Sequence, residues 1–224
     1  MLKLIIKQAN WGILGTVFGF AIGFFVKVYI IDIVGVSNWG KYVSAHTFST
    51  ALDVFLTFGI PVSIVKFFPD LWKANKDYAL QFIGKVLRIS VILSLSLIVA
   101  LYFSVPLIDK FVYTQIDDFS PILFLVALHT PISIFTGIIT ALYRSVLKIK
   151  EIIIYSTVIT VPIRAILAFI IFQYTDNILY FVGIELFTTS LSLFLLFRRF
   201  NKAEYKVLNF NVNANFVWDN KFVS

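Results

Sequence analysis

The sequence contains no cysteine and only two histidines among its 224 residues. Without cysteine it can form no disulfide, no thiolate nucleophile and no thiolate-ligated metal centre. Charged residues make up only 14% of the chain, against roughly 25% in an ordinary soluble domain. No nucleotide-binding glycine loop, no HExxH zinc pair and no GxSxG elbow occurs, so we expect neither an enzyme, a metal site nor a cofactor.

Hydrophobic residues, in contrast, fill 59% of the positions. They form runs of about 20 residues separated by short charged breaks, the length that an α-helix needs to cross a bilayer. The formal net charge of +7 does not predict nucleic-acid binding, because the basic residues lie between the apolar runs rather than on one accessible face. The sequence therefore predicts an all-α, polytopic helical bundle with the lipid bilayer as its solvent.

Six spans are predicted, and together they make one unit over residues 1–200. The first two are joined only by Gly35–Trp39 and form a hairpin, and a basic loop from Lys66 to Lys85 is expected between the second and third. A polar tail follows at 201–224. The predicted spans are 9–34, 40–65, 87–108, 119–143, 152–174 and 178–197.

The distribution of lysine and arginine predicts the orientation, because translocation of these residues across the membrane is disfavoured. Lys41 and Lys110 lie on one side of the predicted spans, and fifteen basic residues lie on the other. Both termini are therefore expected in the cytoplasm, with the chain in the cell (inner) membrane. The fifteen are Lys3, Lys7, Lys66, Lys73, Lys76, Lys85, Arg88, Arg144, Lys148, Lys150, Arg198, Arg199, Lys202, Lys206 and Lys221.

Small residues and one cation follow a single stripe of the first span. Gly15, Gly19, Gly23 and Lys27 recur every fourth residue, which places them on one helical face. The glycines are typical of close packing against a neighbouring helix. Lys27 could reach the outer interface with its long side chain, but burial within the bundle is the favoured interpretation.

The second span carries a polar stripe of His46, Thr50, Asp53 and Thr57 on an otherwise apolar helix. Asp53 is expected near the middle of the membrane. A carboxylate at that depth costs several kcal/mol unless it is paired, hydrated or protonated. The stripe therefore predicts that Asp53 faces a partner or a cavity.

Two further charges lie inside later spans, Arg164 in the fifth and Glu185 in the sixth. Their estimated depths predict two opposite-charge pairs, Asp53 with Arg164 and Lys27 with Glu185. Such pairs either hold the bundle together or line a pathway for a substrate or ion, and the sequence leaves both open. His129 in the fourth span is either a proton-relay group or a hydrogen-bonded interior histidine, with the second favoured.

Two motifs resemble a known family. The turn VGVSNWGKY at 34–42 and the segment DVFLTFGIPVSIVKFFP at 53–69 are similar to those of Wzx-type polysaccharide-biosynthesis flippases of the multidrug/oligosaccharidyl-lipid/polysaccharide exporter superfamily. Asn38, Trp39 and Lys66 depart from the acidic residue, tyrosine and arginine that are frequent there.

The resemblance implies a carrier with two six-helix lobes that moves a lipid-linked oligosaccharide of the polyprenyl pyrophosphate type by alternating access. This chain would supply one lobe, with 201–224 as the connection to a missing second lobe or with a homodimer partner in its place. Lys27, His46, Asp53, Arg164 and Glu185 would line the substrate or ion pathway, with Lys27 and Arg164 offsetting the anionic charge. Two alternatives remain: an antiporter coupled to protons or sodium ions, and a membrane subunit that does not transport.

Overall fold

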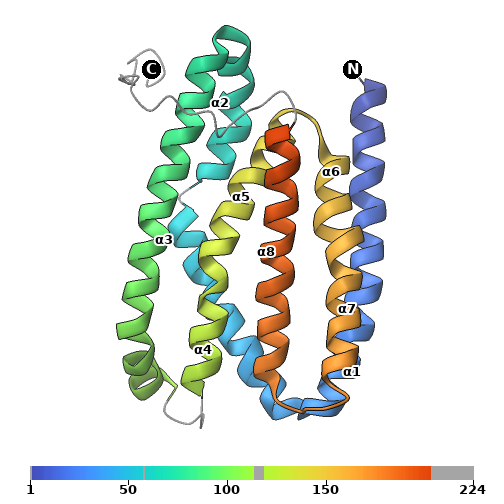
Figure 1. Ribbon diagram of the computed structural model, residues 1–224, viewed down its shortest axis with the longest axis vertical. Coiled ribbons are helices and arrows are strands. Elements are labelled where there is room, and N and C mark those ends of the chain that lie inside the picture. The colour runs from blue at the N-terminus through green and yellow to red at the C-terminus, as the bar shows by residue number, and fades with distance from the viewer. Residues whose placement is uncertain (1, 58, 114–118, 203–224) are drawn as a thin grey trace.

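A computed structural model describes residues 2–57, 59–113 and 119–202, in which every regular element is a helix (Figure 1). The helical bundle predicted from the sequence is confirmed. The elements are α1 (Leu2–Thr57), α2 (Ile60–Ala74), α3 (Lys76–Val112), α4 (Phe119–Ala127), α5 (His129–Ser145), α6 (Ile149–Ile153), the π-helix η1 (Ile154–Ile159), α7 (Thr160–Ile171) and α8 (Ile178–Lys202).

Five helical stretches among the described residues are long and apolar enough to cross a membrane. The first of them, within α1, is bent at Gly35, whose φ of 81° is not helical. Glycine lacks a Cβ and adopts positive φ without steric penalty. From this corner the second leg of α1 turns back along the bundle, so that the two legs run in opposite directions (Figure 1). The hairpin predicted at Gly35–Trp39 is therefore present.

The second leg does not continue to residue 65 as one helix. Gly59 has a φ of 69° and separates α1 from α2. The expected basic loop from Lys66 to Lys85 is wrong, because α2 and α3 continue through it with a tight turn at Asn75. The Asn75 side chain accepts hydrogen bonds from the backbone N–H groups of Asp77 and Tyr78 and so caps α3.

Apolar side chains explain why this basic segment is helical. Phe68, Leu71, Ala79 and Ile83 are buried, whereas lysines such as Lys73 and Lys76 lie on the exposed face. This is the pattern of an amphipathic helix that packs on one side only. The charges made the segment look like a loop, but its apolar face packs against the rest of the bundle.

Prolines mark the irregular points of the two spans that follow α3. Pro131 has no N–H group with which to bond the carbonyl of Ala127, and the helix is interrupted at Leu128 between α4 and α5. In the next span the π-helical η1 comes shortly before Pro162. π-Helical turns are rare, and those that occur often lie at functional sites.

The helix ends and turns of the described residues gather at two opposite ends of the bundle. The start of α1, the α2–α3 turn, the α5–α6 turn and the end of α8 lie at the upper end in Figure 1, and the Gly35 corner and the α7–α8 turn lie at the lower end. The upper end therefore carries the described members of the fifteen basic residues. We refer to it as the basic end.

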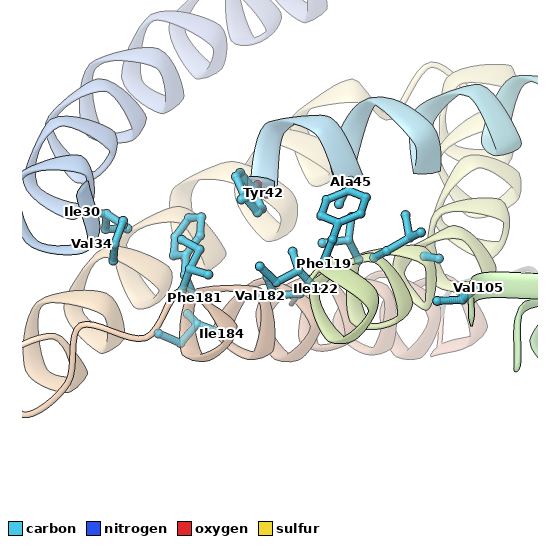
Figure 2. Close-up of a cluster of buried hydrophobic side chains, with 14 of the residues drawn as sticks. Ile30, Val34, Tyr42, Ala45, Val105, Phe119, Ile122, Phe181, Val182 and Ile184 are labelled. Carbon is cyan, nitrogen blue, oxygen red and sulfur yellow. The ribbon is translucent and has the colours of Figure 1, made fainter. Parts of the chain in front are cut away.

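Two buried clusters hold the helices together. One joins α1, α3, α4, α7 and α8 through residues such as Ile30, Phe119 and Phe181 (Figure 2). The other joins α2, α3, α5, α6 and α8 through Phe68, Ile83 and others. Large apolar side chains also cover the outside, as with Phe20 at 74% exposed and Phe25 at 72%. Hydrocarbon rather than water suits such a surface, as expected of a multi-pass membrane protein.

Candidate functional site

The charged residues of the fifth and sixth spans form an ion pair inside the bundle. Arg164 Nη1 lies 2.9 Å from Glu185 Oε1, and the two side chains are only 29% and 12% exposed. Arg164 Nε donates to the Thr188 hydroxyl at 3.0 Å, and Nη2 donates to the Thr189 hydroxyl at 3.3 Å. Each of the three guanidinium nitrogens therefore has an acceptor on α8.

The second oxygen of Glu185 is also occupied. The Tyr42 hydroxyl donates to Glu185 Oε2 at 2.7 Å. Tyr42 belongs to the second leg of α1, so one carboxylate connects α1, α7 and α8. We call Tyr42, Arg164, Glu185, Thr188 and Thr189 the ion-pair cluster. Hydrogen bonds to charged groups are stronger than neutral ones, and this set satisfies both charges.

Both predicted pairings are wrong. Arg164 pairs with Glu185 rather than with Asp53, and Lys27 does not contact Glu185. The short connection between α7 and α8 explains the observed pair, because α7 ends at Ile171 and α8 begins at Ile178. Arg164 is seven residues before the first end and Glu185 is seven residues after the second. Equal steps from one tight connection place both residues at the same depth on neighbouring helices.

A chain of polar side chains continues from the ion-pair cluster to α5 and α1. His129 Nε2 lies 3.0 Å from the Thr189 hydroxyl, which also accepts from Arg164. The ring of His129 is 6.3 Å from that of His46, measured between centroids. His46 Nδ1 in turn lies 3.3 Å from the Thr50 hydroxyl. His129 is therefore a hydrogen-bonded interior histidine, the interpretation favoured from the sequence.

Asp53 lies further along the same polar stripe of α1. Its carboxylate interacts with the hydroxyls of Ser133 and Thr130 on α5 and electrostatically with both histidines. Within the described part of the chain, the buried Oδ1 atom has no hydrogen-bond partner. We call His46, Asp53 and His129 the histidine–aspartate group. An oxygen left unpaired in a buried site is costly, and it can accept a proton or a cation.

Lys27 has a different environment from the other charged candidates. The expected burial of Lys27 within the bundle is wrong, because its side chain is exposed in the structure. Its Nζ atom lies 5.8 Å from the centroid of the Trp39 ring. The Trp39 ring packs on the rings of Tyr42 and Phe181, with centroid distances of 4.8 Å and 5.8 Å. Among the described residues Lys27 has no ion-pair partner, so its charge is available to a ligand beside an aromatic surface.

The glycine stripe serves helix packing at two of its three positions. A Cβ atom at Gly15 would collide with Ile153, and one at Gly19 would lie 2.9 Å from Thr157 Cγ2. Both neighbours belong to α6 and η1. At Gly23 a Cβ would meet nothing within 4 Å. The close approach predicted for the stripe is therefore confirmed at Gly15 and Gly19 and absent at Gly23.

Sequence reasoning missed the uncharged partners of this site. Tyr42, Thr130, Ser133, Thr188 and Thr189 supply most of its hydrogen bonds. The only available signal was spacing, since Thr188 and Thr189 follow Glu185 by three and four residues and share its helical face. Among the described residues, no set of three or more His, Asp or Glu side chains is arranged so that it could hold a metal ion.

The chain matches one protein-family model. Residues 5–217 align with the model described as "Polysaccharide biosynthesis protein", which covers all the spans and both motifs noted in the sequence. No curated protein and no solved structure matches the chain.

Proposed function

The chain belongs to the polysaccharide biosynthesis protein family, that of the Wzx-type flippases, and from this premise we propose that it translocates a lipid-linked oligosaccharide across the cell membrane. The substrate class is a sugar chain on a polyprenyl pyrophosphate. The family match over residues 5–217 carries the proposal. The membrane bundle with charged groups in its interior supports it, because a polar, anionic headgroup needs compensating polar groups to pass through hydrocarbon.

Lys27 is the residue that we assign to the pyrophosphate. Its charge has no ion-pair partner in the described structure, and the neighbouring Trp39 ring offers an apolar face to a sugar. Arg164 differs, since Glu185 neutralises it and each of its three guanidinium nitrogens donates to an acceptor on α8. We therefore move Arg164 and Glu185 from the substrate pathway to the framework that supports it. This assignment revises the sequence-based one, in which both cations offset the substrate charge.

Alternating access requires two bundles that move against each other around a shared site. We propose that this chain forms one lobe and that a second six-helix lobe or a second copy of the chain supplies the other. Both termini are assigned to the cytoplasm, because the basic end carries most of the lysine and arginine. The exposed His46, Thr50 and Lys27 side chains would then face the partner lobe rather than lipid.

Reconstitution tests the proposal. The full chain, with its partner lobe or as a purified dimer, is placed in liposomes with a fluorescent lipid-linked oligosaccharide, and movement between leaflets is measured by quenching from outside. We expect flipping with the wild type, retention with Lys27→Arg and a loss of about tenfold or more with Lys27→Gln, since one desolvated charge contact is worth about 1.5–3 kcal/mol. Full activity of Lys27→Gln would refute the assignment of Lys27. Flipping by a proven monomer would refute the need for a second lobe.

One observation favours a second candidate function, cation-coupled antiport. The unpaired Oδ1 of Asp53 near His46 and His129 is the kind of group that binds a proton or sodium ion. If the chain is such an antiporter, transport collapses when the ion gradient is dissipated, and Asp53→Asn uncouples transport from it. If transport is unchanged when the proton gradient and the sodium gradient are dissipated, this candidate function is excluded. Absence of transport with either substrate class would instead favour a subunit that only binds partner helices.

A further inference from the structure

An apolar groove of about 420 Å³ lies on the bundle between α3, α5 and α8. In Figure 1 α5 runs between the other two helices. Ser190 is the one polar side chain in its lining, which also comprises Leu87, Val91, Phe135, Ile139, Leu193, Phe194 and Phe197. None of these residues belongs to the ion-pair cluster or to the histidine–aspartate group. A groove with this lining suits a hydrocarbon chain and offers nothing to a sugar.

The groove is open to its surroundings. Val91 is 45% exposed and Phe194 is 57% exposed, although both are large and apolar. In a multi-pass membrane protein such a surface is in contact with lipid tails, the most abundant apolar molecules available to it. The lining alone would accept any tail and does not select a lipid.

Two arginines next to the groove in sequence could select a lipid by the charge of its headgroup. Arg88 precedes Val91 by three residues on α3, and Arg198 follows Phe194 by four residues on α8. These spacings place each arginine one turn from a lining residue on the same helical stripe. Both lie toward the basic end, where α3 begins and α8 finishes (Figure 1).

Both guanidinium groups are available to a ligand. Arg88 and Arg198 are exposed, and neither forms an ion pair within the described ranges of the chain. The apolar groove therefore adjoins, on α3 and on α8, one exposed arginine each without an ion-pair partner in the described residues, and this combination suits an anionic lipid. An acyl chain suits the groove, and a phosphate suits the guanidinium groups.

A second groove provides an internal comparison. It has a volume of about 560 Å³ and lies between α7 and α8 near their connecting turn, at the opposite end of the bundle. Its lining is also mostly apolar and includes Tyr180 and Phe187. The charged residues near it in sequence are the exposed Asp176 and the pair Arg164 and Glu185, which neutralise each other. This groove has the apolar surface without the cations and is not expected to select an anionic headgroup.

We propose that the groove between α3, α5 and α8 is a binding site for an anionic phospholipid of the leaflet at the basic end. One acyl chain lies along Val91, Phe135 and Phe194, and Arg88 and Arg198 bind the phosphate. We assign the site to a phospholipid rather than to the transported lipid because the groove faces outward and is separate from the polar groups assigned to transport. The proposal does not depend on the function proposed above.

Fluorescence quenching tests the site directly. The full-length Phe194→Trp variant, in detergent, is titrated with brominated phosphatidylglycerol or brominated phosphatidylcholine, and the signal of the unsubstituted chain is subtracted. We expect stronger quenching by phosphatidylglycerol. Removing either arginine, as Arg88→Gln or Arg198→Gln, should lower the preference about fivefold. High salt should also lower it, because screening weakens attraction between exposed charges.

Two variants serve as controls. Lys73→Gln removes an exposed cation at the basic end but away from the groove, and it should leave the preference unchanged. Phe187→Trp places the reporter in the second groove and should show no preference between the two lipids. Equal quenching by both lipids at Phe194→Trp, or an unchanged preference after loss of both arginines, overturns the proposal. Displacement of the brominated lipid by polyprenyl phosphate but not by unlabelled phosphatidylglycerol also overturns it and assigns the groove to the transported lipid.

Discussion

The charged residues inside this bundle differ in whether a partner neutralises their charge. Arg164 and Glu185 pair with each other, and their remaining polar atoms bind neighbouring side chains. Within the described residues, Asp53 has one buried oxygen without a hydrogen-bond partner, and Lys27 lies beside Trp39 without an ion-pair partner. A charge that is already paired has little left to offer a ligand, whereas an unpaired one is costly unless a ligand completes it. This difference is the reason for the three roles that we propose: support for Arg164 and Glu185, ion binding for Asp53 and substrate binding for Lys27.

A double-mutant cycle checks the pairing of Arg164. We expect Arg164→Gln and Glu185→Gln each to destabilise the chain, because each leaves the opposite charge unpaired inside the bundle. The double variant should lose less than the sum of the two, with a coupling of about 0.5–3 kcal/mol in the free energy of unfolding. Unfolding in detergent by denaturant titration measures all three.

The matched control pairs Arg164→Gln with Asp53→Asn. These two residues have no direct contact and are linked only through His129 and Thr189, so their coupling should be smaller than that of Arg164 with Glu185. Coupling between Asp53 and Arg164 that exceeds the coupling between Glu185 and Arg164 would restore the pairing predicted from the sequence.

At the scale of the element, glycines decide how α1 packs. Gly15 and Gly19 bring α1 against Ile153 and Thr157, whereas Gly23 faces open space. We expect Gly15→Leu and Gly19→Leu each to destabilise the bundle by about 1–3 kcal/mol, because a larger side chain forces the helices apart. Gly23→Leu is the control and should be tolerated. Thermal unfolding of the three variants in detergent compares them, and equal losses at all three sites would contradict the packing described here.

A second glycine acts through its backbone. Gly59 ends the second leg of α1 with a φ of 69°, and a Cβ there would meet nothing within 4 Å. Gly59→Ala should therefore destabilise by about 1–2 kcal/mol through conformational strain alone. Gly12→Ala, where the space is equally open but the backbone is helical, should instead stabilise by up to about 1 kcal/mol. Thermal unfolding in detergent compares the stabilities of the two variants. If Gly59→Ala leaves the stability unchanged, the backbone at residue 59 does not require a positive φ.

At the scale of the whole molecule, the arrangement of turns predicts which sites share a side of the membrane. Ser37 follows the Gly35 corner by two residues, and Thr175 belongs to the α7–α8 turn; both of these features lie at the lower end in Figure 1. Asn75 lies in the α2–α3 turn at the basic end. Single cysteines at Ser37 and Thr175 should react with an impermeant thiol reagent in intact cells, and one at Asn75 should not. Permeabilised cells should label all three. Labelling of Asn75 in intact cells would reverse the assigned orientation.

The sequence by itself determined the class of fold and the unequal distribution of lysine and arginine between the two ends of the bundle. Long apolar runs can only be helices in lipid, because every backbone polar group must be satisfied within the segment. Local residue patterns were enough to predict the Gly35 hairpin, the close glycine packing at two of three positions, and the family. Each of these depends on residues that are near one another in the sequence. The helical course of residues 66–85 did not, since its lysines hid an apolar face that packing against the bundle makes visible.

Only the tertiary structure decided which charges meet. The sequence places a residue by its depth in the membrane, and Arg164, Glu185, Asp53 and Lys27 all had oppositely charged candidates at similar depths. Depth is a single coordinate, however, and a salt bridge also depends on which helices are neighbours and which faces they present. Close packing of α7 on α8, with Tyr42 of α1 beside them, joined Arg164 to Glu185 and left Asp53 and Lys27 to other surroundings.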